Sequence, residues 1–220
     1  DKFIQGVDLN LFRPIPRGRG ERFIVYSGGK LEHRKGQDIL VAAFREFVKT
    51  HPDAVLATTW HNPWPESIMG ITLGGHVANV PRIDDAGNCD IMRWIAENGV
   101  PEKNIHDYGM VSNHLMPEVF AQADVAVFPN RCEGGTNLVA MEAMASGVPC
   151  ILSANTGHLD LIEDDNCYPI TNQAEISSLP YAKDWGESSV DEIVELLCRV
   201  YANKHEAILR GEQGTKFMQD

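Results

Sequence analysis

The sequence lacks the patterns that define several common classes of protein. Its five cysteines are an odd number at wide spacings without a CxxC pair, which argues against a zinc site and against a disulfide framework. No apolar run approaches the roughly 18 residues of a membrane-spanning helix, and the first ten residues have neither the basic start nor the apolar centre of a signal peptide. These absences favour a reducing, cytoplasmic compartment.

Positive charge is also scarce. The net charge is -12 and the acidic residues are spread along the chain, so broad attraction to nucleic acid or to an anionic membrane is excluded. Any anionic ligand must therefore be held by local positive features. The 220 residues are 43% hydrophobic and contain neither an internal repeat nor a low-complexity run, which is enough for one substantial core or two small ones.

Short β-rich apolar runs alternate with helical patterns along most of the chain. This alternation predicts an α/β fold with a doubly wound, Rossmann-like parallel sheet flanked by helices. The predicted strands cover residues 23–28, 54–60, 104–109, 124–129 and 149–152. The predicted helices follow them at residues 37–49, 91–99, 112–122, 138–146, 158–162 and 188–204.

Two stretches fit this alternation less well. Residues 61–89 have three prolines and no clear period, so a short helix, a surface loop and a contact face for a partner all remain open. Residues 204–220 are expected to form an exposed helical tail.

In a parallel sheet of this kind, ligands bind beyond the carboxyl ends of the strands. The loop after the first strand there reads SGGKLEHRKG, where Gly28 and Gly29 let the backbone approach a ligand and Lys30 and Lys35 supply positive charge. The loop has neither the GxxxxGK[ST] spacing of a P-loop nor the GxGxxG of a dinucleotide site. It is therefore a positive loop of another kind.

A second specialised loop reads CEGGTNLVAMEAMASG over residues 132–147. Here Gly134, Gly135 and Thr136 precede a helix that is expected to start near Asn137 or Leu138. The free amides at a helix start carry roughly half a positive charge and bind anions. Two lysines and this helix start would give an acidic protein a local positive pocket.

Two carboxylates flank the same helix start. Glu142 lies in the helix among apolar residues, and its side chain leans back toward the helix N-terminus, where hydroxyls of a sugar would satisfy it. Glu133 lies at the strand-to-helix turn. Phosphate, ribose and a second sugar together indicate one ligand, a nucleotide sugar.

These motifs resemble a known family. GKLEHRKG, followed about a hundred residues later by EGGTNLVAMEAMASGVP, is similar to the retaining glycosyltransferases of the GT-B fold, also called glycosyltransferase group 1. The segment QGVDLNLFRP resembles the one that joins the two domains of these enzymes. The resemblance implies that residues 1–20 are an interdomain linker and residues 21–203 the C-terminal, nucleotide-sugar-binding domain, followed by the tail.

The resemblance also implies roles for individual residues. Lys30 stands where the family has an arginine and Lys35 where it has a lysine, and this pair binds the donor diphosphate. Glu133 and Glu142 match the two glutamates of an E-x7-E pattern, which contact the donor sugar and the ribose, although eight residues separate them here. Backbone groups at Met110 and Val111 would contact the base.

The activity that the resemblance implies is metal-independent transfer of a hexose, with retention of configuration, from a UDP- or GDP-linked donor to an unknown acceptor. No further cofactor is expected. An N-terminal domain would bind the acceptor and would be the only part to associate peripherally with a membrane, so the chain alone is expected to be inactive. A GT-B epimerase, a phosphorylase and a non-catalytic nucleotide-binding or assembly module are the alternatives.

The sequence offers no convincing metal site. Asp84 and Asp85 are adjacent carboxylates without a third ligand, which favours a solvated loop. Trp60 and Trp64 are expected to be packing residues rather than a platform for a base.

Overall fold

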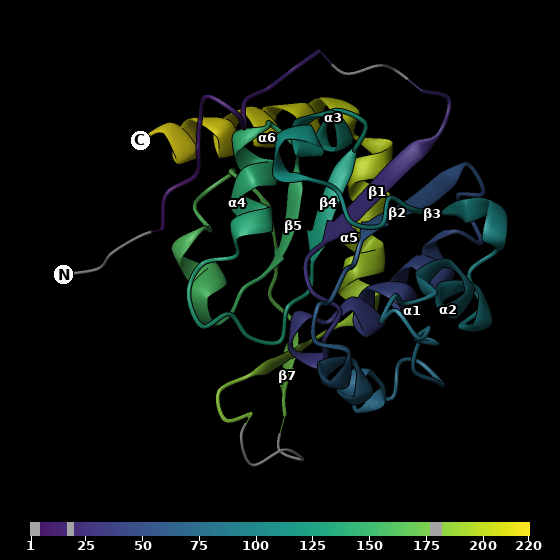
Figure 1. Cartoon of the computed structure of the whole chain (residues 1–220). Coiled ribbons are helices and arrows are strands. Elements are labelled where there is room, and N and C mark those ends of the chain that lie inside the picture. The colour runs from purple at the N-terminus through teal and green to yellow at the C-terminus, as the bar shows by residue number, and fades with distance from the viewer. Residues whose placement is uncertain (1–4, 17–19, 177–181) are drawn as a thin grey trace.

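A computed structural model describes residues 5–16, 20–176 and 182–220 of the chain (Figure 1). Parts of the predicted linker (1–4 and 17–19) and residues 177–181 of the predicted domain lie outside the described residues. Among the described residues, none of the helices is long and apolar enough to cross a membrane.

The centre of the molecule is a six-stranded sheet in which every neighbouring pair of strands is parallel. The strand order is β3-β2-β1-β4-β5-β6, which is the order of a doubly wound Rossmann sheet. The predicted fold class is therefore confirmed. The strands are β1 (Phe23–Gly28), β2 (Ala54–Thr59), β3 (Ile105–Asp107), β4 (Val125–Phe128), β5 (Cys150–Ser153) and β6 (Tyr168–Ile170).

Helices cover both faces of this sheet (Figure 1). One apolar cluster joins the sheet to α1 (Gln37–Phe47), α2 (Ile91–Glu97) and α5 (Val190–Ala202). The other joins it to α3 (Met116–Phe120) and α4 (Leu138–Ala145), with the end of α6 (Lys204–Gln219) packed against it. Along β4, Val125 and Val127 point into the first cluster and Ala126 and Phe128 into the second. Because both faces are buried, the strand has the continuous apolar pattern that predicted it.

The C-terminal helix differs from its prediction. Helix α6 is not an exposed tail, because it runs beside α4 and buries Ala207, Gly211 and Gly214 (Figure 1). A Cβ atom on Gly211 would lie only 2.4 Å from the carbonyl oxygen of Gly147. The small residues on one side of α6 thus allow close packing against the end of α4.

Three strands were not predicted by the sequence pattern, which also leaves the structure of residues 61–89 open. Strand β6 extends the sheet, and β7 (Gln173–Glu175) pairs antiparallel with β8 (Gly186–Ser188) in a separate hairpin. A 3₁₀ helix over Pro65–Thr72 lies within the uncertain segment 61–89 and buries Ile68 and Ile71 in the first apolar cluster. This segment therefore contains a short helix that belongs to the core.

Candidate functional site

The loops after β1 and β4 lie next to each other. These two strands are neighbours in the sheet, and the strand order reverses between them. Loops that leave such a reversal point on either side form the usual ligand crevice of a doubly wound sheet. Both loops predicted to carry the site are therefore at the position where this fold binds ligands.

A group of four polar side chains joins the two loops, and we call it the Glu133 cluster: Arg34, Lys35, Asn130 and Glu133. Lys35 Nζ and Asn130 Nδ2 both contact Oε1 of Glu133. Arg34 Nη1 donates to the other oxygen, Oε2, at 3.0 Å. The structure thus brings the predicted Lys35 and Glu133 together although they are 98 residues apart in the sequence.

The Glu133 carboxylate is ionised in this setting. Its side chain is only 6% exposed, and burial by itself would raise its pKa, but the positive charges of Lys35 and Arg34 outweigh burial and hold the pKa below the usual value. Neither Arg34 nor Asn130 was predicted from the sequence. Arg34 is a polar residue of the same positive loop, which was the available signal.

The glycine turn after Glu133 leads directly into α4. Extra Cβ atoms on Gly134 and Gly135 would meet nothing within 4 Å, so the space in front of the helix is open. The hydroxyl oxygen of Thr136 is buried and lacks a hydrogen-bond partner within the described part of the chain. Asn137 caps the helix by accepting a hydrogen bond from the backbone N–H of Ala140 at 3.5 Å. The helix starts at Leu138, whose side chain is partly exposed, in agreement with the predicted start.

The loop after β5 supports this turn from behind. Thr156 Oγ1 accepts a hydrogen bond from the backbone N–H of Glu133 at 2.8 Å, and the N–H of Gly157 donates to the Glu133 carbonyl at 3.2 Å. The ring of His158 is buried between Asn137 and Ser153, at 3.1 and 2.9 Å. Burial lowers the pKa of His158 to about 4, so the ring is neutral at physiological pH.

Glu142 lies on α4, one turn beyond Leu138. It is half-buried on α4, and burial raises the pKa of its carboxyl to about 7. Its charge acts on the phenol of Tyr26, which lies beneath the end of β1: a Cβ atom on Gly28 would be 2.1 Å from the Tyr26 hydroxyl. The charge of Glu142 therefore acts on a side chain that lies against Gly28, another predicted site residue. Without a ligand, this carboxyl is poised to titrate near neutral pH.

Lys30 is placed differently from Lys35. Gly29 turns the chain with a φ of +107°, and the exposed Lys30 side chain then reaches over the ring of Trp64, with Nζ 4.2 Å from the ring centroid. Its ammonium therefore lies on an aromatic ring and not on the carboxylate that Lys35 contacts. Trp64 itself is 53% exposed, so the prediction that it is a packing residue is wrong, whereas Trp60 is buried as expected.

The two residues predicted to contact a base follow β3. The side chain of Met110 is largely exposed, and Val111 packs partly against the second apolar cluster. Their backbone lies beyond the carboxyl end of a strand, as the predicted role requires.

The loop that holds Asp84 is turned by that carboxylate, which accepts hydrogen bonds from the N–H groups of Ala86 and Asn88.

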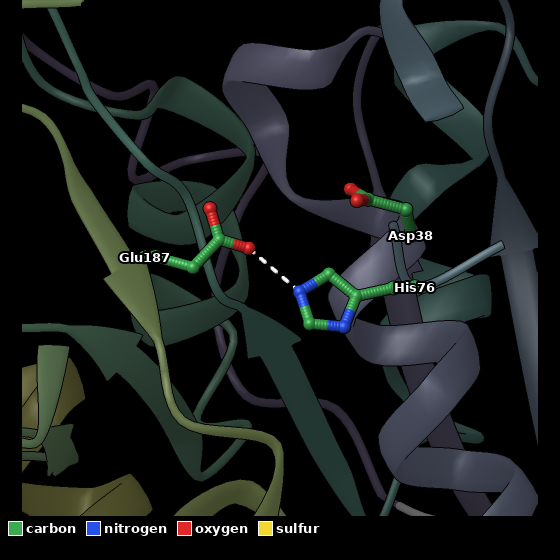
Figure 2. A group of neighbouring side chains, drawn as sticks. All are labelled: Asp38, His76 and Glu187. Atoms are coloured by element: carbon green, nitrogen blue, oxygen red, sulfur yellow. Dashed lines mark hydrogen bonds and ion pairs between the residues drawn. The ribbon is translucent and has the colours of Figure 1, made fainter. Parts of the chain in front are cut away.

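A second charged group lies beside the site, and we call it the Arg131 cluster: Asp38, His76, Arg131 and Glu187. Asp38, His76 and Glu187 come from three separate segments and place ligand atoms within 4.8 Å of one another, close enough to hold a metal ion (Figure 2). The guanidinium of Arg131, however, already donates two hydrogen bonds to Asp38, both at 2.7 Å, and two to Glu187, at 2.6 and 2.7 Å. A cation at this position would compete with a guanidinium that fits both carboxylates.

The Arg131 cluster was not predicted from the sequence. Nothing in the pattern around Arg131 indicates that this side chain is fully buried. Its guanidinium also donates to the carbonyl of His33 at 2.6 Å, which fixes the 3₁₀ turn His33–Lys35 of the positive loop. The cluster therefore holds in place the segment that carries Arg34 and Lys35.

Comparison with known families agrees with this geometry. The model of the family "Glycosyl transferases group 1" matches residues 21–197, and the chain belongs to this family. Among curated relatives, it is 26% identical over 192 residues to the GDP-mannose-dependent alpha-(1-6)-phosphatidylinositol monomannoside mannosyltransferase of Mycolicibacterium smegmatis, covering 80% of this chain and 44% of that protein. It is 29% identical over 190 residues to the D-inositol 3-phosphate glycosyltransferase of Segniliparus rotundus, covering 79% of this chain and 37% of that protein. The chain thus spans less than half the length of these relatives.

Solved structures share the fold. The C-terminal domain of a glycosyl transferase group 1 protein, LpcC of Francisella tularensis, aligns with a TM-score of 0.68 at 17% identity and covers 97% of both chains. Sucrose-phosphate synthase of Thermosynechococcus elongatus aligns at 0.69 with 20% identity, covering 97% of this chain and 46% of the other. HepE of Anabaena, solved with UDP and glucose, aligns at 0.67 with 15% identity, covering 97% of this chain and 50% of the other. The predicted resemblance, to the C-terminal domain of a GT-B glycosyltransferase, is therefore confirmed.

Proposed function

We propose that this chain is the donor-binding domain of a retaining, metal-independent glycosyltransferase that takes a hexose from UDP or GDP. One observation carries the proposal: Lys35 and Glu133 meet at the reversal point of the sheet, beside the open glycine turn before α4. The name of the mycolicibacterial relative specifies GDP-mannose, and HepE was solved with UDP. Both bases are therefore candidates.

The positive groups at this position suit a diphosphate leaving group. When the bond between the sugar C1 and the diphosphate oxygen breaks, the oxygen keeps the electron pair and gains negative charge. The ammonium of Lys35 and the amides that precede α4 would stabilise this charge, and each 1.36 kcal/mol of such stabilisation is worth about tenfold in rate. Lys30 would add a second ammonium once it leaves Trp64.

The remaining predicted residues would hold the rest of the donor. The carboxylate of Glu133 would face the transferred sugar, and Glu142 would accept hydrogen bonds from the ribose hydroxyls. The backbone at Met110 and Val111 would contact the base. Acceptor binding would fall to an N-terminal domain, so this chain by itself is expected to bind donor without transferring the sugar.

Calorimetric titration of the chain with UDP, GDP and ADP, and with their nucleosides, tests the proposal. A charge-assisted hydrogen bond is worth about 1.5–3 kcal/mol, so Lys35→Met should weaken diphosphate binding by about 10- to 100-fold and nucleoside binding much less. The matched control is Lys49→Met, since Lys49 also pairs with a glutamate, Glu46, but on the exposed side of the molecule. No binding of any nucleotide would favour an assembly module, and equal losses for diphosphate and nucleoside would contradict the phosphate role.

A further inference from the structure

Arg34 is the least expected member of the Glu133 cluster. Its side chain donates three hydrogen bonds: Nη1 to the carbonyl of Cys132 at 2.9 Å and to Glu133 Oε2 at 3.0 Å, and Nη2 to Glu32 at 2.6 Å. Its own carbonyl accepts from the N–H of Arg131 at 2.8 Å. Both the backbone and the side chain of Arg34 therefore bind the segment that presents Glu133.

Glu133 has a conflict that this arrangement resolves. Its carboxylate is nearly buried, and a buried carboxylate without a cation is costly. In the free chain Lys35 supplies one cation, but the proposed function requires the same ammonium to bind the donor diphosphate. Without another cation, Glu133 would hold Lys35 and compete with the diphosphate for it.

We propose that Arg34 is a positioning residue that keeps Glu133 charged and in place while Lys35 turns to the diphosphate. The geometry divides the carboxylate between the two cations, because Lys35 contacts Oε1 and Arg34 contacts Oε2. Asn130 also donates to Oε1 and remains there when Lys35 leaves. Arg34 is itself anchored on Cys132 and Glu32, so its position does not depend on Lys35.

The inference rests on the proposed function, and it makes a prediction that a direct phosphate contact does not. Removing Arg34 should weaken diphosphate binding only because Glu133 then retains Lys35. The loss should therefore disappear when Glu133 is already neutral. A residue that contacts the phosphate directly would show the same loss in both backgrounds.

A double-mutant cycle with Arg34→Gln and Glu133→Gln tests this, using calorimetric titration of the chain with UDP and GDP. We expect Arg34→Gln alone to weaken diphosphate binding by about tenfold and to change binding by less than about twofold in the Glu133→Gln background. Arg34→Lys should recover part of the affinity, because it keeps the charge but loses the two-pronged contact. Arg93→Gln is the matched control, since Arg93 pairs with Glu97 on an exposed helix face.

The outcomes separate the two proposals. If the unmodified chain binds no nucleotide, the proposed function fails and this inference fails with it. If the unmodified chain binds and Arg34→Gln binds equally well, or loses the same factor with and without the carboxylate, this inference alone is overturned. Thermal unfolding of each variant shows whether a loss reflects misfolding, and Arg34→Lys provides a second reading if Arg34→Gln does not fold.

Discussion

The Arg131 cluster and the Glu133 cluster contact opposite ends of the 3₁₀ turn His33–Lys35, but their positive and negative groups are balanced in different ways. In the Arg131 cluster, two carboxylates surround one guanidinium that is 0% exposed, and four hydrogen bonds join them. In the Glu133 cluster, two cations share the Glu133 carboxylate, and Arg34 also pairs with Glu32; the cations are 14% and 29% exposed. The first arrangement has two carboxylates for one guanidinium, whereas the second matches two cations, Arg34 and Lys35, to two carboxylates, Glu133 and Glu32.

This difference separates a structural group from the group that we propose to bind the diphosphate. A lysine ammonium has three donors, and Glu133 occupies one of the three on Lys35. The remaining donors can face an anion that enters from solvent. The Arg131 guanidinium instead connects α1, the positive loop and the β7–β8 hairpin through Asp38, the His33 carbonyl and Glu187.

Removal of the Arg131 guanidinium should have the largest effect on stability. Arg131→Met leaves Asp38 and Glu187 without their guanidinium, and breaking a buried pair in this way typically costs about 3–5 kcal/mol of unfolding free energy. Denaturant unfolding measures the loss. Arg93→Met, on an exposed pair, should leave the unfolding free energy almost unchanged; similar losses in the two variants would mean that the Arg131 cluster is not structural.

A second prediction concerns Glu142 and pH. Its pKa of about 7 in the folded chain lies above that of the unfolded chain, so the folded state keeps a proton that the unfolded state loses as the pH rises above about 4.5. Stability due to this group therefore falls between about pH 4.5 and 7. Glu142→Gln should be more stable than the unmodified chain by about 1–2 kcal/mol at pH 8, after allowance for partial solvent screening, and equal to it at pH 4.

Urea unfolding at the two pH values checks the stability of this variant, and UDP titration checks its binding. If Glu142 belongs to the site, Glu142→Gln should make the protein more stable but weaken its binding of UDP, because the buried charge lowers stability and contributes to ligand binding. Loss of stability at pH 8 would place Glu142 with the structural charges instead.

The smallest expected effect is at the rim of the Arg131 cluster. His76 Nε2 contacts Glu187 Oε1 at 2.7 Å, but Arg131 continues to contact both carboxylates when the ring is removed. His76→Ala should therefore cost only about 1 kcal/mol in thermal or denaturant unfolding. His114→Ala, at an exposed position, is the control, and a loss as large as that of Arg131→Met would show that the imidazole is essential to the cluster.

Much of the fold could be predicted because its signals are local. The apolar runs of β1, β2, β4 and β5 are short, continuous stretches, two of which are closed by a turn residue, Gly28 or Pro129. Their alternation with helices is enough to indicate a parallel sheet. Strand β6 and the β7–β8 hairpin are only three residues per strand, too short to show a period. The burial of α6 depends on α4, so its own pattern could not reveal it.

The residues of the candidate site were likewise predictable only in part. Lys35, Glu133, Glu142 and the glycine turn were found because they lie in two recognisable loops. The partners of Glu133 could not be chosen from the sequence, since the chain has several cations near each loop and spacing does not say which of them reaches a given carboxylate. Lys30 illustrates this: its place in the motif predicts a phosphate contact, and the structure places its ammonium over Trp64.

Hydrophobic period and glycine position act over short distances, so the amino-acid pattern is enough to indicate the order of strands and helices, the family and the two loops that carry the proposed donor site. Which charges meet depends on how the chain folds in three dimensions. Arg131 with Asp38, and Arg34 with Glu133, are joined across 93 and 99 residues by the pairing of β1 with β4. A charge buried by that pairing must find its partner there, because water is no longer available to solvate it.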